Sequence, residues 1–174
     1  PIEAALFASK SPINYFNKEK FIFLKFRKFK DLDFNGLFKK LDKEISASKL
    51  KIYNMDSSMK HINYAKKNSK IVGIGKKIKF SRMDMEWLDT KFGKGEIDKI
   101  ITKMPTHNEN ELYNEFFYQA EFVLNENGKI VLIGNKDPIK KYSSKYKLKV
   151  SDQTEIFSGK MKYDVFILTK KRYN

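Results

Sequence analysis

The stretch of residues 99–133 constrains the fold more than any other part of the chain. Residues 100–102 form a short β-branched run, apolar side chains recur at helical spacing over residues 112–124, and residues 130–133 are apolar without interruption. A strand–helix–strand unit with buried strands is typical of a parallel sheet covered by helices. Such sheets bind ligands at the carboxyl ends of their strands. We therefore expect a functional site at the segment that follows the first strand, residues 103–106.

The flanking segments predict further strands and helices of the same sheet. Ser57 and Ser58 are placed to cap a helix, and Ser158 and Gly159 predict a turn between two strands, hence an antiparallel hairpin. The order favours an open α/β sheet that ends in a hairpin. Helical patterns cover residues 1–10, 37–45 and 59–68; strand patterns cover residues 50–54, 77–80, 146–150, 154–157 and 164–169; residues 134–144 indicate a loop or a weak helix.

We predict one domain over residues 1–174, with an insertion at residues 11–48 whose first half interleaves phenylalanines and lysines. Two interpretations of the insertion differ in what the rings contact. A basic aromatic surface would stack bases and bind phosphates. In an irregular insertion, the rings would pack on the domain while the lysines face water. We favour the second interpretation for most of the rings, which are Phe16, Phe21, Phe23, Phe26, Phe29 and Phe34.

The charge of the chain is strongly positive, with 36 basic and 21 acidic side chains and a formal net charge of +15. An RNA partner would explain this excess. A lysine-rich proteome, in which lysine covers every solvated face, would explain it equally well. The absence of cysteine excludes disulfides and thiolate metal sites and fits a reducing cytosol. No apolar run approaches the length of a membrane span. We expect His61 and His107 to be surface side chains rather than metal ligands.

Two carboxylates follow predicted strands. Asp56 comes after the strand LKIYN and Asp84 after the strand KIKF, with one predicted helix between them. In doubly wound nucleotide-binding folds, an acid at such a position hydrogen-bonds ribose hydroxyls. As a bare pattern, however, an aspartate at a strand end is more often a turn or helix-capping residue. The pattern alone leaves both roles open.

The ordered motifs resemble those of the THUMP-associated, S-adenosylmethionine-dependent RNA guanine-N2 methyltransferases. The opening PIEAAL is similar to the segment that directly follows the glycine-rich motif of that family. FIFLKFRKFKDLDF resembles its aromatic insertion, KIYNMDSSMKHINYAKKNSKIVGI its second-strand motif, and KIKFSRMDMEWL its third-strand motif. DKIITKMPTH falls at its catalytic loop, and LYNEFFYQAEFVLNENGKIVLIG at the helix and strand that follow. The resemblance covers nearly the whole chain.

This resemblance implies a Rossmann-like methyltransferase sheet and S-adenosylmethionine as the cofactor. It implies methyl transfer to guanine N2 in transfer or ribosomal RNA, in the cytoplasm. Asp56 would contact the ribose and Asp84 the adenine, with Ser57 and Met85 beside them in the cofactor-binding set. The family's glycine-rich loop and first strand would come before Pro1 and are not in this sequence. Without that strand, the strand before Asp56 would expose an unpaired edge. We therefore expect a missing segment or a second chain to supply it, and weak cofactor binding by the chain alone.

The catalytic positions that the resemblance implies are Lys103, Met104, Pro105 and Thr106, where the family has an Asn-Pro-Pro-Tyr type of loop. The family's asparagine accepts a hydrogen bond from the exocyclic amine, and its aromatic residue stacks the base. Lysine is a donor only, and threonine has no π-face. Two interpretations therefore remain, an RNA methyltransferase domain and a catalytically degenerate relative that binds RNA or completes a larger assembly.

Overall fold

The computed structural model describes all residues except 13, 47–49, 106–108 and 172–174. The chain folds into two compact units, Pro1–Met83 and Asp84–Asn174, and each is considered by itself. Among the described residues, no helix combines the length and the apolar character needed to cross a membrane.

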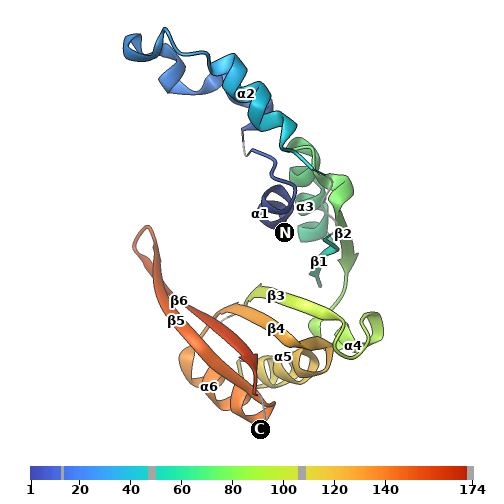
Figure 1. The fold of residues 1–174 in the computed structure, drawn as a ribbon. Coiled ribbons are helices and arrows are strands. Elements are labelled where there is room, and N and C mark those ends of the chain that lie inside the picture. Colours follow the sequence, from blue (N-terminus) through green and yellow to red (C-terminus); the bar gives the residue numbers. More distant parts are fainter. Residues whose placement is uncertain (13, 47–49, 106–108, 172–174) are drawn as a thin grey trace. The chain divides into compact units, whose positions relative to one another are not determined.

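The first unit is a parallel pair of strands with helices (Figure 1). Strands β1 and β2 pair in parallel, with Ile52 beside Ile78 at one end and Asp56 beside Arg82 at the other. A small core of Ala5, Leu6, Ile74 and Ile78 joins the first helix to these strands. The elements are α1 (Ile2–Ala8), η1 (Tyr15–Lys20), η2 (Ile22–Lys25), η3 (Arg27–Phe29), α2 (Phe34–Lys43), β1 (Ile52–Asp56), α3 (Met59–Ile71), η4 (Gly75–Lys77) and β2 (Ile78–Arg82).

The second unit is a four-stranded mixed sheet in the order β3-β4-β6-β5. The β3–β4 pair is parallel, and the β4–β6 and β5–β6 pairs are antiparallel. Its elements are η5 (Met85–Trp87), α4 (Leu88–Lys91), β3 (Ile97–Lys103), α5 (Glu109–Val123), β4 (Leu124–Ile133), α6 (Lys136–Lys145), β5 (Leu148–Ser158) and β6 (Met161–Lys170).

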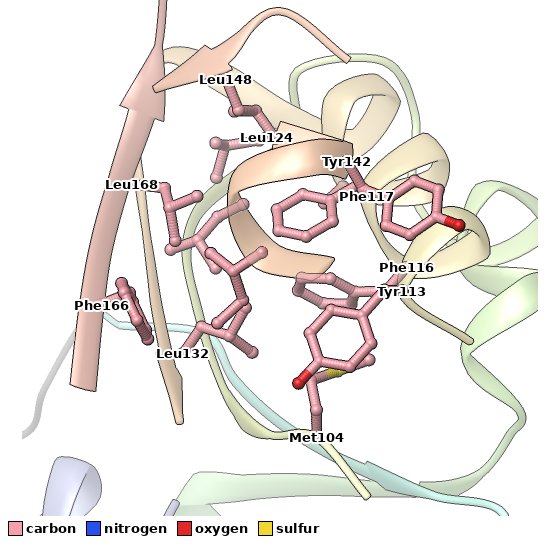
Figure 2. Packing of buried hydrophobic residues seen from close by; sticks show 13 residues of the cluster. Met104, Tyr113, Phe116, Phe117, Leu124, Leu132, Tyr142, Leu148, Phe166 and Leu168 are labelled. Carbon is pink, nitrogen blue, oxygen red and sulfur yellow. The ribbon is translucent and has the colours of Figure 1, made fainter. Parts of the chain in front are cut away.

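The main core lies where α5 and α6 cover one face of this sheet. Figure 2 shows the side chains of Tyr113 and Phe117 of α5, Tyr142 of α6 and Leu132 and Leu168 of the strands packed together. Alternate residues of a strand point to opposite faces. Ile100 packs against this cluster, whereas its neighbour Ile101 points to the other face and is exposed.

The predicted strand–helix–strand unit is confirmed, because β3, α5 and β4 follow one another and the two strands pair in parallel. The predicted terminal hairpin is also confirmed, and Gly159 adopts a positive φ of 59° in its turn. One strand prediction is wrong. Residues 146–150 and 154–157 are not separate strands, because β5 continues past a bulge between Val150 and Asp152 and stays paired with β6.

For residues 134–144 the sequence leaves a loop and a weak helix open, and the structure has the helix α6 over Lys136–Lys145. Pro138 lies in its first turn, where the missing N–H costs nothing. Within the described residues, β1 pairs only with β2. This is the strand beside which we expect the family's first strand.

Candidate functional site

Asp56 is the last residue of β1, and its backbone ties the ends of β1 and β2 together. The Met83 N–H donates to the Asp56 carbonyl oxygen at 3.1 Å. The Asp56 carboxylate accepts the Ser58 N–H at 2.8 Å through Oδ1 and lies 3.1 Å from Nδ1 of His61. These contacts hold the carboxylate at the start of α3, yet 37% of the Asp56 side chain stays exposed. An oriented and accessible carboxylate can accept hydrogen bonds from vicinal hydroxyls of a ligand.

Ser57 and Arg82 form the other polar contact at this end of the sheet. The Arg82 Nε–H donates to the Ser57 carbonyl oxygen at 3.0 Å, and both residues are exposed. Ser58, and not Ser57, caps α3, since its Oγ accepts the His61 N–H at 3.5 Å. His61 lies on the exposed surface of α3, as predicted, whereas His107 lies outside the described residues.

Asp84 and Met85 open the second unit. Asp84 is exposed, and its carbonyl oxygen accepts the Trp87 N–H at 3.2 Å, which starts the turn η5. Met85 is half-buried against the main core cluster. A methionine in this place gives the segment an apolar anchor beside an exposed carboxylate.

Gln119 of α5 fixes the segment that follows Asp84. Its Nε2–H donates to the Glu86 carbonyl oxygen at 2.7 Å, and its Oε1 accepts the Asp89 N–H at 3.0 Å. The side chain is only 3% exposed. Sequence reasoning missed this residue, although a glutamine next to Ala120 on the apolar face of a helix is a signal that a buried polar group has partners.

The end of β3 and the start of the loop after it carry one exposed side chain, Lys103, and one buried side chain, Met104. Met104 is 2% exposed and belongs to the main core, and its N–H donates to the Ile133 carbonyl oxygen at 2.8 Å. Pro105 is half-buried, and Thr106 lies outside the described residues. Met104 is therefore a packing residue, and Lys103 is the exposed side chain at this strand end.

Lys103 lies over an aromatic ring that sequence reasoning did not connect with it. Its Nζ is 4.4 Å from the centroid of the Tyr163 ring. Lys103 pairs with Ile133, and Ile133 with Val165, so Lys103 and Tyr163 share the sheet face opposite α5 and α6. No local pattern in the sequence signals this pair, because it depends on the antiparallel register of β6.

The carboxyl end of β4 packs tightly against α5 beside this loop. The Asn135 N–H donates to the Tyr113 hydroxyl at 2.8 Å. A Cβ atom at Gly134 would lie 2.3 Å from that hydroxyl and 3.4 Å from Cβ of Met104. Met104 and Tyr113 lie in the same cluster (Figure 2). Glycine at position 134 thus allows the close approach that positions Met104.

The predicted site residues fall into two groups. Asp56 and Ser57 share the end of β1 in the first unit, and Met85 and Met104 share the core of the second. Over the described part of the chain, no three His, Cys, Asp or Glu side chains are grouped so that they could hold a metal ion.

The model of the UPF0020 family, described as an RMKL-like methyltransferase domain, matches residues 1–165. The chain belongs to this family. The predicted family is thereby confirmed. A similar curated protein is a tRNA (guanine(6)-N2)-methyltransferase of Methanocaldococcus jannaschii, 29% identical over 179 residues, with 97% of this chain and 45% of that protein covered.

Solved structures show the same fold. SMU.472, crystallised with SAH, superposes with a TM-score of 0.75 at 19% identity, covering 99% of this chain and 45% of that one. A possible methylase from Clostridium difficile 630 gives 0.71 at 24% identity, with 99% and 45% covered. TrmN from Thermus thermophilus gives 0.61 at 22% identity, with 69% and 36% covered. The predicted Rossmann-like methyltransferase fold is confirmed, and the chain spans less than half the length of these proteins.

The candidate residues of the two units differ in the chemistry that they offer. Asp56 is suited to hold hydroxyl groups, since its carboxylate is oriented and still accessible. Lys103 offers three N–H donors and no acceptor, so it can contact a phosphate or a carbonyl oxygen but cannot accept a proton from an amine. The Tyr163 ring supplies a π-face and a hydroxyl at the same strand ends.

Proposed function

We propose that this chain is the catalytic-domain part of an RNA methyltransferase that methylates guanine N2 in transfer or ribosomal RNA. The observation that carries the proposal is the match of residues 1–165 to a methyltransferase domain family. The curated relative from Methanocaldococcus jannaschii is named for guanine-N2 methylation of tRNA, which supports the choice of substrate. The net charge of +15 suits a polyanionic substrate. A cytoplasmic location follows from this substrate and agrees with the lack of cysteine.

The cofactor of this proposal is S-adenosylmethionine, and the residues present fit part of it. The partly exposed carboxylate of Asp56 is an acceptor suited to the ribose hydroxyls, with Ser57 next to it. Exposed Asp84 offers a second carboxylate, suited to the adenine amine, and the half-buried Met85 an apolar contact for the ring. When bound, the cofactor supplies a methyl group on a sulfonium centre. The protein's task is to orient that methyl group toward the base.

We further propose that a strand from outside this sequence, or from a second chain, pairs with β1 on the side away from β2. Among the described residues, β2 is the one strand with which β1 pairs. An open edge of this kind exposes unpaired N–H and C=O groups and invites pairing. The chain covers 45% of its curated relative, so most of that protein's length has no counterpart here.

The cofactor assignment is tested by calorimetric titration of S-adenosylmethionine into the full-length protein. Asp56→Asn removes the negative charge but keeps the shape, and we expect about a tenfold or larger loss of affinity, as for a charged hydrogen bond. Asp152→Asn, an exposed position on β5, is the matched control. Equal affinity in the two variants would reject the role of Asp56.

The activity is tested by incubating the full-length protein with labelled S-adenosylmethionine and bulk tRNA or ribosomal RNA. Digestion to nucleosides should reveal N2-methylguanosine. Label in any other nucleoside contradicts the proposed reaction.

A catalytically degenerate RNA-binding module is the second candidate, and Lys103 is the observation that favours it. A donor-only side chain stands where the reaction needs an acceptor, and Met104 beside it is buried in the core. This candidate predicts RNA binding without methyl transfer by the full-length protein.

A further inference from the structure

Most rings of the insertion pack on one another, whereas the Phe16 ring lies against Gly73 of the first unit. Phe21 and Phe23 stack with centroids 5.0 Å apart, and Phe23 and Phe34 lie 5.1 Å apart. No residue of η1, η2, η3 or α2 is buried. This differs in part from our expectation that most of the rings would pack on the domain, which Phe16 meets. Residues 15–43 are here called the aromatic platform.

The aromatic platform leaves large apolar side chains in water. Phe16, Ile22, Phe26, Leu32 and Leu37 each expose 48–67% of their surface. Soluble proteins seldom keep so many neighbouring apolar groups exposed unless a partner covers them. The platform contacts its unit through Phe16, since a Cβ atom added at Gly73 would lie 2.8 Å from the Phe16 ring.

Basic side chains are interleaved with these apolar groups along the sequence. The platform carries nine basic and four acidic residues. Lys18 already has partners within the platform. Its Nζ lies 4.4 Å from the Tyr15 ring centroid and forms an ion pair with Asp42. The other basic residues are exposed, namely Lys20, Lys25, Arg27, Lys28, Lys30, Lys39, Lys40 and Lys43.

Exposed rings among exposed cations match one class of ligand in particular. Single-stranded nucleic acid presents base faces that stack on aromatic rings and phosphates that pair with lysine and arginine. A purely apolar protein partner would cover the rings but leave the cations without counter-charges. A double helix would meet the cations but keep its bases from the rings.

We propose that the aromatic platform binds an unpaired segment of RNA. Its bases stack on exposed rings, with Phe26 the principal one, and its phosphates pair with Lys25, Lys28 and Lys30. This deepens the proposed function and rests on its choice of RNA as the substrate. Phe26 is suited to stacking because it is half exposed and its ring is braced by Phe29, 6.1 Å away between centroids.

The stacking part is tested in the full-length protein with a fluorescein-labelled 12-nucleotide oligouridylate and a 12-base-pair RNA duplex as probes. Phe26→Leu keeps the apolar bulk and removes the π-face, and we expect affinity for the single strand to fall about tenfold, as for one lost base stack. Duplex affinity should not change. Phe26→Trp should bind the single strand at least as tightly as the wild type. Because these exposed substitutions leave the core untouched, circular dichroism should show unchanged folding.

The phosphate part is tested with the triple variant Lys25→Gln, Lys28→Gln, Lys30→Gln. The slope of log affinity against log salt for the oligouridylate should decrease by about 2, at about 0.7 per lost phosphate contact. The matched control removes three exposed lysines of the second unit, Lys140→Gln, Lys141→Gln and Lys149→Gln, and should leave the slope unchanged.

Platform variants that bind the oligouridylate like the wild type would overturn the inference, as would equal losses in the control variant. The proposed function is judged separately by the formation of N2-methylguanosine. Methyl transfer that is unaffected by the platform variants, together with unaffected binding, would reject the platform and keep the enzyme. If the platform variants lose binding of the oligouridylate but the wild-type protein never forms N2-methylguanosine, the platform is supported and the enzymatic function is rejected.

Discussion

The Nζ atom of Lys103 lies 4.4 Å from the centroid of the Tyr163 ring, across the intervening strand β4. The ring thus holds the ammonium group at the strand end where the resemblance places the reaction. An exposed cation–π contact of this kind is worth about 0.5–1 kcal/mol. We expect a double-mutant cycle of Lys103→Met and Tyr163→Leu, measured by urea unfolding, to give a coupling energy of that size. Zero coupling would mean that the two side chains are merely neighbours.

The same position makes a prediction for activity. Replacing Lys103 by asparagine restores an acceptor for the exocyclic amine, and replacing Thr106 by tyrosine restores a ring. The double variant Lys103→Asn, Thr106→Tyr should methylate RNA faster than the wild-type protein by about tenfold or more, the scale of one restored interaction in the transition state. Single-turnover rates of the full-length protein provide the measurement. An unchanged or lower rate would show that the loop is not what limits activity.

Gln119 should matter for stability more than its polar side chain suggests. In Gln119→Ala, the Glu86 carbonyl and the Asp89 N–H lose their partner next to the core. We expect the free energy of unfolding to fall by about 1–3 kcal/mol. Since these contacts hold the segment after Asp84, affinity for S-adenosylmethionine should fall as well. Gln153→Ala removes an exposed glutamine of β5 and should change stability by about 0.5 kcal/mol or less.

The parts of the fold that were predictable are those in which neighbours in sequence are also neighbours in space. The helical spacing of Tyr113, Phe117 and Ala120 indicates α5 because one helix face packs on one sheet. The place of Asp56 at a strand end could be predicted because a strand pattern stops there. Roles that depend on pairing between distant segments left no local pattern. Tyr163 reaches Lys103 through two strand registers, and Gln119 reaches Glu86 across a helix–turn contact.

The extent of β5 and the packing of several rings in the insertion were mispredicted for a related reason. A bulge after Val150 looks like a strand end in the sequence, but cross-strand bonds to β6 carry the strand on. Ring–ring packing among phenylalanines such as Phe21 and Phe23 has no period, so nothing in the sequence distinguishes it from packing on a core.

The β5–β6 hairpin has a pH-dependent contact. The hydrogen bond from Lys162 to Glu155 raises the pKa of Lys162 above 10.5. A raised pKa in the folded state means that the stabilisation is complete at neutral pH and is lost as pH rises through that folded value. In Glu155→Gln, NMR titration of the Lys162 side chain should therefore give a lower pKa than in the wild type. The same pKa in both proteins would mean that Glu155 does not hold the ammonium group.

The contact between Gly134 and Tyr113 offers the sharpest test of packing beside the candidate site. A methyl group at position 134 would lie 2.3 Å from the hydroxyl oxygen of the buried Tyr113. We expect Gly134→Ala to cost about 1–3 kcal/mol of unfolding free energy, as overpacking does. Tyr113→Phe alone should cost about 1 kcal/mol, because the Asn135 N–H loses its acceptor.

The effects of Gly134→Ala and Tyr113→Phe on the free energy of unfolding should not be additive. With the hydroxyl gone, the new methyl group has space, so Tyr113→Phe in the Gly134→Ala background should restore stability. Gly93→Ala is the control, since its nearest neighbour would be 3.7 Å away, at Oε2 of Glu96. Urea unfolding of the wild type, the two single variants, the double variant and the Gly93→Ala control gives the free energy of unfolding of each protein. If the two losses of unfolding free energy are strictly additive, removing the Tyr113 hydroxyl does not relieve the strain at position 134. The backbone before α6 would then move instead.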